Sequence, residues 1–399
     1  MAREKRNYYG NSKGGGGKFN NKRSKRRRGP KKENIHPSKF IKVACIKEQE
    51  EYKPKNTFED FKIPDLIQKN ITRQGIVTPS PIQDQSIPQG MAGNDILGIA
   101  NTGTGKTMSF ALPVLKRLLK DKDSKVIIMA PTRELAQQIL DEFKMLTRGA
   151  KVFWALLIGG TSMRTQLKDL SKKPRIIIGT PGRIQDHIKR KSLNLATVNM
   201  VVLDEVDRML DMGFIDDMKN ILGKLAQDRQ SFFFSATMNS KVRNLINEFS
   251  KDPVTISVKT GNTSDNINQD VVKYRSPDDK FDKLHKLLTE NKKNKFLIFD
   301  ETKRGVDKLN KSLQERGFRV DATHGDKSQG QRKRVLAKFK VNQISVLVAT
   351  DVAARGIDIK DITHVINYST PQSYDDYVHR IGRTGRAGRI GHAFTFIRG

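Results

Sequence analysis

The sequence predicts an α/β protein of two domains, each a mostly parallel β-sheet flanked by helices, preceded by a disordered basic tail. Three observations support this prediction. From Phe58 onward, short β-branched runs alternate with longer segments in which apolar residues recur every three or four positions, as in repeated strand–helix–strand units. One polar segment interrupts this alternation, which then resumes. A chain of 399 residues is also long enough for two domains that each bury a core.

The chain starts with a strongly basic segment, since residues 1–33 contain thirteen Lys and Arg against two Glu. Such a segment cannot bury enough apolar surface to offset the entropy lost on ordering, so we expect a disordered tail. Closely spaced cations gain affinity for nucleic acid by releasing counterions, which favours a nonspecific phosphate anchor; a solubilising or localisation tail is the alternative. Residues 34–57 are expected to connect the tail to the first domain, with a short helix left open.

Strands and helices alternate through both predicted domains. In the first domain, residues 58–257, helices are predicted at 107–120 and 134–147, and strands at 95–100, 126–130, 152–158, 176–179, 200–203 and 231–235. Residues 258–268 are polar and contain the run Thr-Gly-Asn-Thr-Ser-Asp-Asn, which predicts a flexible linker. In the second domain, residues 269–399, strands are predicted at 295–299, 319–323, 345–349, 364–367 and 392–397.

The net charge of +32 would be self-repelling without a polyanion, so nucleic acid is the first partner to expect. An anionic membrane is the second, but no amphipathic basic helix or lipidation signal stands out. No apolar run approaches the ~20 residues that span a bilayer, and the first ten residues lack the apolar core of a secretory signal. The single cysteine, Cys45, excludes a cysteine-based zinc cluster, and the histidines lack metal-ligand spacing. We therefore predict a soluble, cytoplasmic protein without membrane association or zinc.

Residues 100–107 directly follow an apolar strand and precede a helix, the context that a phosphate-binding loop requires. Its glycines allow backbone N–H groups to turn toward phosphate oxygens. Lys106 is expected to meet the β- and γ-phosphates, and the Thr107 hydroxyl to bind Mg²⁺. Ala100 stands where the general pattern has its first Gly. The predicted ATP contacts of the loop are Ala100, Asn101, Thr102, Gly103, Thr104, Gly105, Lys106 and Thr107.

The strand predicted at residues 200–203 is followed by Asp204-Glu205-Val206-Asp207. Carboxylates at the carboxyl end of such a strand face the crevice where α/β sheets bind ligands. Asp204 suits a Mg²⁺ shell, and Glu205 suits orienting and deprotonating the water that attacks the γ-phosphate. A plain helix cap or surface pair is the alternative, which the neighbouring phosphate loop disfavours.

Residues 379–386, His-Arg-Ile-Gly-Arg-Thr-Gly-Arg, place three arginines at three-residue spacing. A solvated basic helix face is the usual meaning of that spacing, but Gly382 and Gly385 each weaken a helix by ~1 kcal/mol. Guanidinium groups suit the charge that develops on a γ-phosphate, and an arginine finger contributes roughly 10³–10⁵ in rate. The segment therefore predicts transition-state stabilisation of phosphoryl transfer.

In this order, the motifs resemble those of the DEAD-box RNA helicases of helicase superfamily 2, over about residues 58–397. Phe58, Gly75 and residues 79–83 resemble the Q motif. The other first-domain motifs are I at 100–107, Ia at 131–136, GG at 159–160, Ib at 180–183, II at 204–207 and III at 235–237. Those of the second domain are IV at 296–299, QxxR at 331–334, V at 349–358 and VI at 379–386. Motif II departs from the family name, with Val206 in place of Ala, for which we expect a packing adjustment and retained activity.

The resemblance implies two RecA-like domains and an RNA-stimulated ATPase that unwinds or remodels RNA duplexes and RNA–protein complexes, with ATP and Mg²⁺ as cofactors. Gln83 would bind the adenine edge, Phe58 would stack on it, and Asp358 would contact the ribose. The implied catalytic residues are Lys106, Asp204, Glu205, Arg383 and Arg386. The implied residues coupling the ATP site to domain closure are Asp207, Ser235, Thr237 and His379. The implied RNA contacts are Arg133, Gly160, Thr180, Arg183, Gln331, Arg334 and Thr350.

Three questions stay open at the level of sequence. An ATP-gated RNA clamp or scaffold with little unwinding shares every motif, whereas a DNA-directed helicase is disfavoured by the Q motif and motif II. Ribosomal or another structured RNA is an expectation at the level of the family only. Family members usually add a helix after the last predicted strand, so the resemblance leaves a truncated second domain open, because the sequence stops at Gly399.

Overall fold

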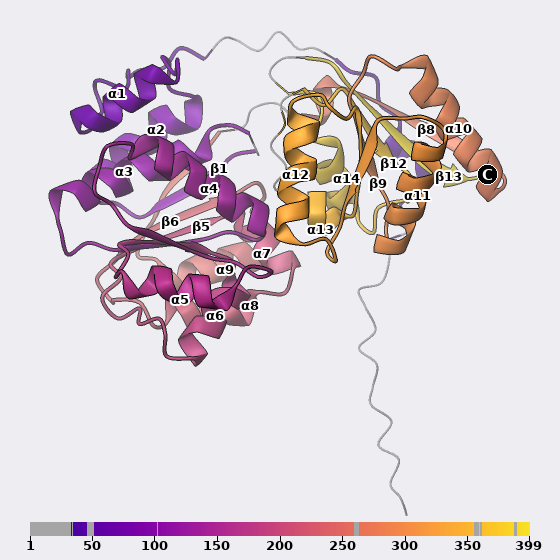
Figure 1. Ribbon diagram of the computed structural model, residues 1–399. Helices are drawn as coiled ribbons and strands as arrows, with labels where there is room; N and C mark the ends of the chain where they lie inside the picture. Colours follow the sequence, from indigo (N-terminus) through magenta and orange to yellow (C-terminus); the bar gives the residue numbers. More distant parts are fainter. Residues whose placement is uncertain are drawn as a thin grey trace, which may run out of the picture.

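The computed structural model describes residues 33, 35–45, 52–101, 103–258, 263–354, 359, 361–386 and 389–399. Two α/β domains lie next to each other, the first drawn in indigo to pink and the second in orange to yellow (Figure 1). The predicted tail lies outside the described residues except for Glu33. Two predicted ATP contacts, Thr102 and Asp358, also lie outside them.

The first domain contains seven parallel strands in the order β3-β4-β2-β5-β6-β1-β7. They are β1 (Ile96–Ile99), β2 (Val126–Met129), β3 (Trp154–Leu157), β4 (Ile176–Gly179), β5 (Met200–Asp204), β6 (Gln230–Ser235) and β7 (Val254–Ser257). The helices are α1 (Asp65–Arg73), α2 (Pro81–Met91), α3 (Lys106–Lys120), α4 (Arg133–Leu146), α5 (Met163–Ser171), α6 (Pro181–Lys189), α7 (Val206–Asp211), α8 (Ile215–Leu222) and α9 (Ser240–Phe249).

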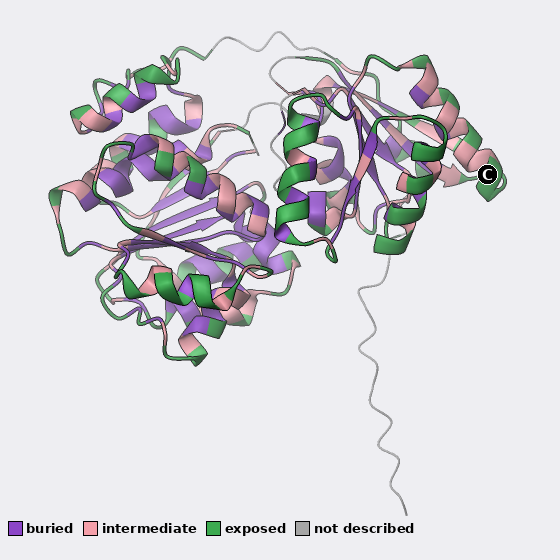
Figure 2. Cartoon of the chain, in the orientation of Figure 1, coloured by how far each residue is buried: buried purple, intermediate pink, exposed green. Residues whose placement is uncertain are grey.

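Both faces of this sheet are covered, which is why its central strands are continuous apolar runs. Helices α1 to α4 pack on one face, and α6 to α9 pack on the other. The buried residues accordingly concentrate in the strands and on the inward helix faces (Figure 2). All six predicted strands are present, and β7 is an additional edge strand whose partly exposed residues give little sequence signal.

The second domain contains six parallel strands in the order β10-β11-β9-β12-β13-β8. They are β8 (Ile267–Tyr274), β9 (Phe296–Phe299), β10 (Val320–Thr323), β11 (Val346–Ala349), β12 (His364–Asn367) and β13 (Gly391–Arg398). The helices are η2 (Thr263–Asn266), α10 (Pro277–Glu290), α11 (Lys303–Glu315), α12 (Gln329–Lys340), α13 (Asp351–Ala354) and α14 (Tyr374–Ile381). Because β8 begins at Ile267, the predicted linker, residues 258–268, extends two residues too far.

The predicted connecting segment, residues 34–57, is divided between the two domains. Residues 35–45, including the 3₁₀ helix η1 (Pro37–Phe40), lie on the second domain, where Lys42 forms an antiparallel bridge to Gln269 in β8. Residues 52–57 lie on the first domain, where Asp84 of α2 accepts hydrogen bonds from the Tyr52 hydroxyl and from the backbone of residues 55 and 56. Among the described residues, no helix is both long and apolar enough to cross a bilayer, and no three acidic, His or Cys side chains form a metal-binding group.

Candidate functional site

The phosphate-binding loop connects the buried strand β1 to helix α3. Gly103 and Gly105 adopt left-handed conformations with φ of +83° and +90°, which a residue with a Cβ rarely adopts. Lys106 is the first residue of α3, and its buried Nζ donates to the carbonyl oxygen of Ala100 at 3.0 Å. The Thr104 hydroxyl donates to the carbonyl oxygen of Asn101 at 2.9 Å. The loop therefore curls back on itself around the Lys106 ammonium group.

The predicted adenine contact, Gln83, forms a hydrogen bond to this loop. Its Nε2 donates to the carbonyl oxygen of Gly105 at 3.0 Å, and its Oε1 accepts from the backbone N–H of Ser80 at 2.9 Å. The Ser80 hydroxyl donates to the carbonyl oxygen of Thr104 at 2.7 Å. A Cβ on Gly105 would lie 2.5 Å from Gln83 Nε2, so this contact requires a glycine. Gln83 thus ties the start of α2 to the phosphate loop.

Phe58 does not present a stacking surface. Its side chain is only 2% exposed, belongs to the core below α1 to α4, and packs edge-to-face on Phe61 with ring centroids 5.9 Å apart. Phe58 therefore serves as a core residue in this structure, and its stacking on adenine stays a prediction.

The two acidic residues of motif II lie where β5 ends. Asp204 is the last residue of the strand, and Glu205 has φ of +55°, a left-handed turn that starts α7. Burial raises the pKa of Asp204 to about 6, although the Lys106 ammonium opposes this shift. Asp204 Oδ1 is buried and has no hydrogen-bond partner in the described part of the chain. A buried, unsatisfied carboxylate oxygen beside the phosphate loop fits a hard divalent cation, which prefers oxygen ligands.

Glu205 is held in its charged form by cations from both domains. Burial opposes ionisation, but the Arg208 and Lys106 side chains outweigh it, and the pKa of Glu205 is lowered. Arg208 Nε lies 3.5 Å from Glu205 Oε2. Arg383, which belongs to the second domain, also contributes to the lowered pKa. A buried carboxylate that stays ionised can orient and accept a proton from a water molecule.

Asp207 connects motif II to motif III. Its Oδ2 accepts hydrogen bonds from the backbone N–H of Ala236 at 3.1 Å and of Thr237 at 2.9 Å, and from the Thr237 hydroxyl at 3.0 Å. The Ser235 hydroxyl donates to the carbonyl oxygen of Thr237 at 2.7 Å. One carboxylate therefore fixes the loop after β6 in place relative to Asp204 and Glu205.

Helix α14 carries motif VI toward the first domain. Arg380 makes a bidentate ion pair with Asp351 at 2.6 and 2.7 Å, and its side chain lies over the Phe299 ring. Arg383 is 4% exposed and, with His379, lines a small pocket that also includes Arg208 of the first domain. The sequence does not predict that Arg380 pairs with Asp351 of motif V. Arg380, Arg383 and Arg386 are equally spaced, so the spacing does not distinguish Arg380 from the other two arginines.

Arg386 lies next to the phosphate loop of the opposite domain. A Cβ added to Gly103 would lie 3.7 Å from Arg386 Nη1. The Arg386 Nε donates to the carbonyl oxygen of Gly382 at 3.0 Å, which holds the side chain against its own loop. Across the domain interface, Arg386 therefore lies beside Gly103, and Arg383 lies in one pocket with Arg208 and lowers the pKa of Glu205.

Four of the predicted RNA contacts lie together in the first domain. The Arg133 guanidinium covers Gly159 and Gly160, where an added Cβ would lie 2.9 and 2.3 Å from its nitrogens. Arg133 also lines a pocket of about 300 Å³ that reaches into the second domain. Its other lining residues include Thr180, Arg183, Gly325, Arg332 and Val352. Thr350 follows β11 in the second domain, two residues before Val352.

The two remaining predicted RNA contacts, Gln331 and Arg334, do not line this pocket. Gln331 is exposed, and its side chain caps its own helix by accepting from the backbone N–H of Ser328 at 2.9 Å. Arg334 is exposed as well. The pair with the same spacing that faces the first domain is instead Gln329 and Arg332. Because α12 begins after the N-cap Ser328, the face of the helix that turns toward the first domain carries Gln329 and Arg332 rather than Gln331 and Arg334.

Arg332 and Glu134 form a buried ion pair between the domains. Arg332 Nη2 lies 2.8 Å from Glu134 Oε2, and the two side chains are 5% and 4% exposed. Gln329 Nε2 donates to Glu134 Oε1 at 3.4 Å. Burial raises the pKa of Glu134, although Arg332 opposes the shift. Since one partner comes from α4 and the other from α12, this buried pair exists only when the domains are together.

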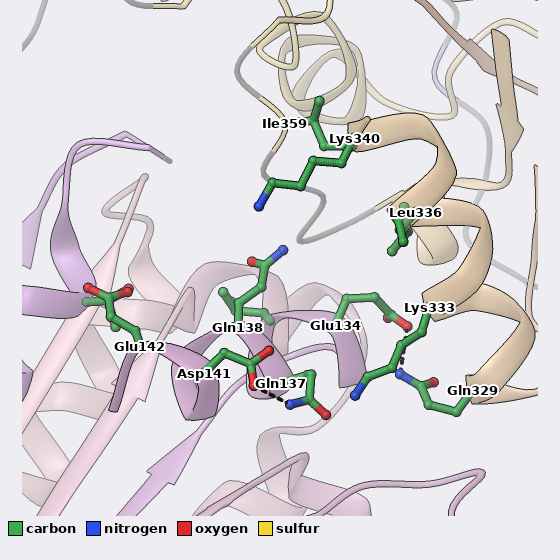
Figure 3. Close-up of a pocket in the computed structure, with 13 residues that line it drawn as sticks. Glu134, Gln137, Gln138, Asp141, Glu142, Gln329, Lys333, Leu336, Lys340 and Ile359 are labelled. Atoms are coloured by element: carbon green, nitrogen blue, oxygen red, sulfur yellow. Dashed lines mark hydrogen bonds between the residues drawn. The ribbon is translucent and has the colours of Figure 1, made fainter. Parts of the chain in front are cut away.

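A pocket of about 360 Å³ adjoins this ion pair and also lies between α4 and α12. As Figure 3 shows, acidic and amide side chains of α4 face lysines of α12 across it. The α4 wall contains Glu134, Gln137, Gln138, Asp141 and Glu142, and the α12 wall contains Gln329, Lys333, Leu336 and Lys340. Opposite charges on the two walls favour the approach of the domains.

A phosphate loop and two carboxylates on one parallel sheet, faced by arginines from a second sheet, define a two-domain nucleoside-triphosphatase of the helicase type. Sequence profiles agree: DEAD/DEAH box helicase matches residues 80–245, and the helicase conserved C-terminal domain matches residues 279–388. The chain is 45% identical to the ATP-dependent RNA helicase CshA of Listeria monocytogenes, over 86% of this chain and 66% of that protein. It is 43% identical to the CshA of Bacillus subtilis, over 86% of this chain and 69% of that protein. The chain belongs to the DEAD-box helicase family, and it spans about two thirds of the length of these relatives.

Two solved structures with bound nucleotide and RNA resemble this chain over both domains. Saccharomyces cerevisiae Dbp5 bound to RNA and ADP BeF3 is 30% identical and has a TM-score of 0.75, covering 86% of this chain and 90% of that chain. Mss116p bound to ssRNA and AMP-PNP is 31% identical with a TM-score of 0.78, covering 89% and 77%. A DEAD box protein from Methanococcus jannaschii is 41% identical but has a TM-score of only 0.51, over 86% and 93%. The domains are thus arranged as in the two nucleotide- and RNA-bound structures.

Proposed function

We propose that this protein is an ATP-dependent RNA helicase in which hydrolysis depends on closure of the two domains around ATP and RNA. The proposal is carried by two arginines of the second domain: Arg386 lies next to Gly103 of the phosphate loop, and Arg383 lines a small pocket with Arg208 of the first domain. Neither domain alone holds a complete site. Binding of ATP and RNA across the interface favours closure to the extent that both bind the closed form more tightly.

Each residue of the phosphate site has a separate task in this proposal. Lys106 binds the β- and γ-phosphates, and Glu205 orients the attacking water and accepts its proton. Thr107 and Asp204 would hold Mg²⁺, partly through water, and the bound ion would supply charge neutralisation for the phosphate oxygens. Arg383 and Arg386 stabilise the charge that develops on the γ-phosphate. Ribose binding by Asp358 stays a prediction.

The valine of motif II is expected to be compatible with this chemistry. Val206 is fully buried in the core between the sheet and α6 to α9, so its extra volume lies behind the carboxylates. The neighbouring carboxylates keep the positions that the strand end and α7 give them. We therefore propose that the Asp-Glu-Val-Asp form of motif II is an active variant.

RNA is the proposed polynucleotide, bound through its backbone with little sequence preference. The pocket lined by Arg133, Thr180 and Arg183 supports this proposal, because polar and cationic groups suit phosphate and 2′-hydroxyl contacts. The groove also reaches the second domain, so RNA bound there would engage both domains. A structured RNA target and a cytoplasmic location stay predictions.

The decisive test compares Lys106→Ala and Glu205→Gln in an ATPase assay with and without RNA. Lys106→Ala should abolish ATP binding, whereas Glu205→Gln should keep ATP and RNA binding and lose roughly 10²–10⁴-fold in turnover. RNA of equal length should stimulate the wild-type protein more than DNA does. Undiminished turnover by the Glu205→Gln protein would refute the assignment.

A clamp that holds RNA without unwinding it is the second candidate. The buried Arg332–Glu134 pair would stabilise a closed, RNA-holding state, which is the observation in its favour. The relatives named as helicases favour unwinding instead. A strand-displacement assay on a short duplex with a single-stranded tail separates the two, because a clamp would hydrolyse ATP without releasing the strand.

A further inference from the structure

Residues 35–45, which we call the N-terminal clasp, are anchored on the second domain by one buried side chain. Phe40 is 0% exposed, whereas its neighbours Ile41 and Val43 are 58% and 81% exposed. The backbone reinforces the anchor, since Lys42 exchanges two hydrogen bonds with Gln269 at 3.0 and 2.7 Å. The backbone N–H of Cys45 donates to the carbonyl oxygen of Asp265 at 2.8 Å.

Phe40 packs directly on the helix that carries motif VI. Its ring meets that of Tyr377 edge-to-face with centroids 4.7 Å apart. The same cluster of buried residues includes Ile267, Ile381 and Ala393. Ile381 is the last residue of α14 and precedes Arg383 by two positions. Phe40 therefore fills the space beneath the end of the helix from which the arginine emerges.

The loop that follows α14 rests on this cluster as well. Gly385 has φ of +68°, and a Cβ there would lie 2.7 Å from Ile267 Cγ1. The motif VI loop thus contacts the cluster through a close approach that only glycine permits. The bidentate pair of Arg380 with Asp351 also fixes α14. The orientation of the helix is therefore set by an ion pair together with an apolar cluster.

We propose that Phe40 is a positioning residue for Arg383 and Arg386, acting through Tyr377 and Ile381. The inference rests on the proposed function, because it assumes that these arginines assist ATP hydrolysis. Truncating Phe40 leaves a cavity under α14 that the helix can relax into. A displacement of about 1 Å in a catalytic group can cost roughly 10²-fold in rate. Phe40 lies outside both matched family regions, residues 80–245 and 279–388, so this support comes from a segment that those profiles do not include.

The test measures steady-state ATPase activity of the full chain at saturating RNA, with ATP varied. Phe40→Ala should lower kcat at least about tenfold, while KM for ATP changes less than about twofold, because the phosphate loop belongs to the other domain. Phe40→Leu retains an apolar group of smaller volume and should lose about threefold in kcat. An RNA-affinity measurement by fluorescence anisotropy accompanies each variant.

Two control variants separate positioning from simple destabilisation. Phe396 is 1% exposed and packs in a different cluster, with Tyr368 and away from α14, so Phe396→Ala should lower the melting temperature but leave kcat within about threefold. Ile41→Ala, an exposed neighbour in the clasp, should behave as wild type.

A kcat of Phe40→Ala that matches that of Phe396→Ala overturns the proposal. If Phe40→Ala does not fold, Phe40→Leu decides, since an unchanged kcat in that variant also overturns it. Failure of the proposed function would appear differently, as a wild-type protein without RNA-stimulated ATPase activity.

Discussion

Replacing Arg332 by alanine should prevent the two domains from closing without unfolding either of them. The ion pair with Glu134 measures 2.8 Å, and both side chains are at least 95% buried. Removing one partner of a buried pair costs ~3–5 kcal/mol when the other charge stays buried. Here the cost falls on closure, because opening the domains returns Glu134 to water. Each domain keeps its own core in the open form.

The protonation of Glu134 sets an upper limit on this cost. A carboxyl with an ordinary pKa of 4.5 can be neutralised at pH 7 for about 3 kcal/mol, after which it can be buried without its partner. The expected loss in RNA-stimulated ATPase activity is therefore at most roughly 300-fold at pH 7. At pH 6 protonation costs about 2 kcal/mol, so the loss should shrink to roughly 30-fold. The activity loss of Arg332→Ala shrinks at lower pH because Glu134 enters the closed state of this variant as a neutral acid.

Steady-state ATPase assays at saturating ATP, with RNA varied, give the required numbers. Arg334→Ala is the matched control, because Arg334 lies on the same helix but is exposed. It should stay within about threefold of wild type, and both variants should melt like wild type. If Arg334→Ala lost as much activity as Arg332→Ala, the assignment of the interdomain pair to Gln329 and Arg332 would be wrong. An Arg332→Ala protein within threefold of wild type would also refute the reasoning.

Three further predictions concern other parts of the chain. Asp207→Ala removes the acceptor of three hydrogen bonds from motif III, each worth ~1.5–3 kcal/mol; it should lower RNA-stimulated turnover more than tenfold while ATP affinity, measured by nucleotide titration, changes less. Burial and the neighbouring His392 lower the pKa of His364 from 6.5 to about 4. Between these pH values the unfolded chain binds a proton that the folded chain does not, so about 3 kcal/mol of folding stability that is present above pH 6.5 is lost as the pH falls toward 4. His364→Phe should reduce this loss of stability at acidic pH, as measured by denaturant titration. Deleting residues 1–33 should weaken RNA affinity and flatten its salt dependence, and an unchanged salt slope would rule out a phosphate anchor.

The phosphate site is largely predictable from sequence because its signals are local. A buried β-branched strand followed by glycines and Lys106 specifies a loop and the start of a helix within a few residues. The position of Asp204 follows in the same way, from the end of a fully apolar strand. Such motifs carry both the geometry and the residue types, so they need no knowledge of the rest of the chain.

Contacts between distant segments are not encoded in this way. The run Gln-Gly-Gln-Arg-Lys-Arg at residues 329–334 contains two pairs of equal spacing, and only the phase of α12 shows which pair faces the first domain. Phe58 could equally stack on a base or anchor a core, and its burial decides for the core. Phe40 is followed by the apolar residues Ile41 and Val43, and nothing local shows that Phe40 is the one that is buried beside α14. The edge strand β7 is partly exposed, which weakens its apolar pattern.

The division of residues 34–57 between the domains makes the first domain an insertion within the second. The chain contacts the second domain at residues 35–45, builds the first domain from residue 52 onward, and returns at residue 263. Two short crossings therefore join the domains, and at ~3.6 Å per residue they span at most about 25 Å from Cys45 to Tyr52 and about 18 Å from Val258 to Thr263. Because the length of both connections is limited, the two domains can separate only as far as these connections reach. Opening therefore keeps the arginines at a high effective concentration around the phosphate loop of the same chain.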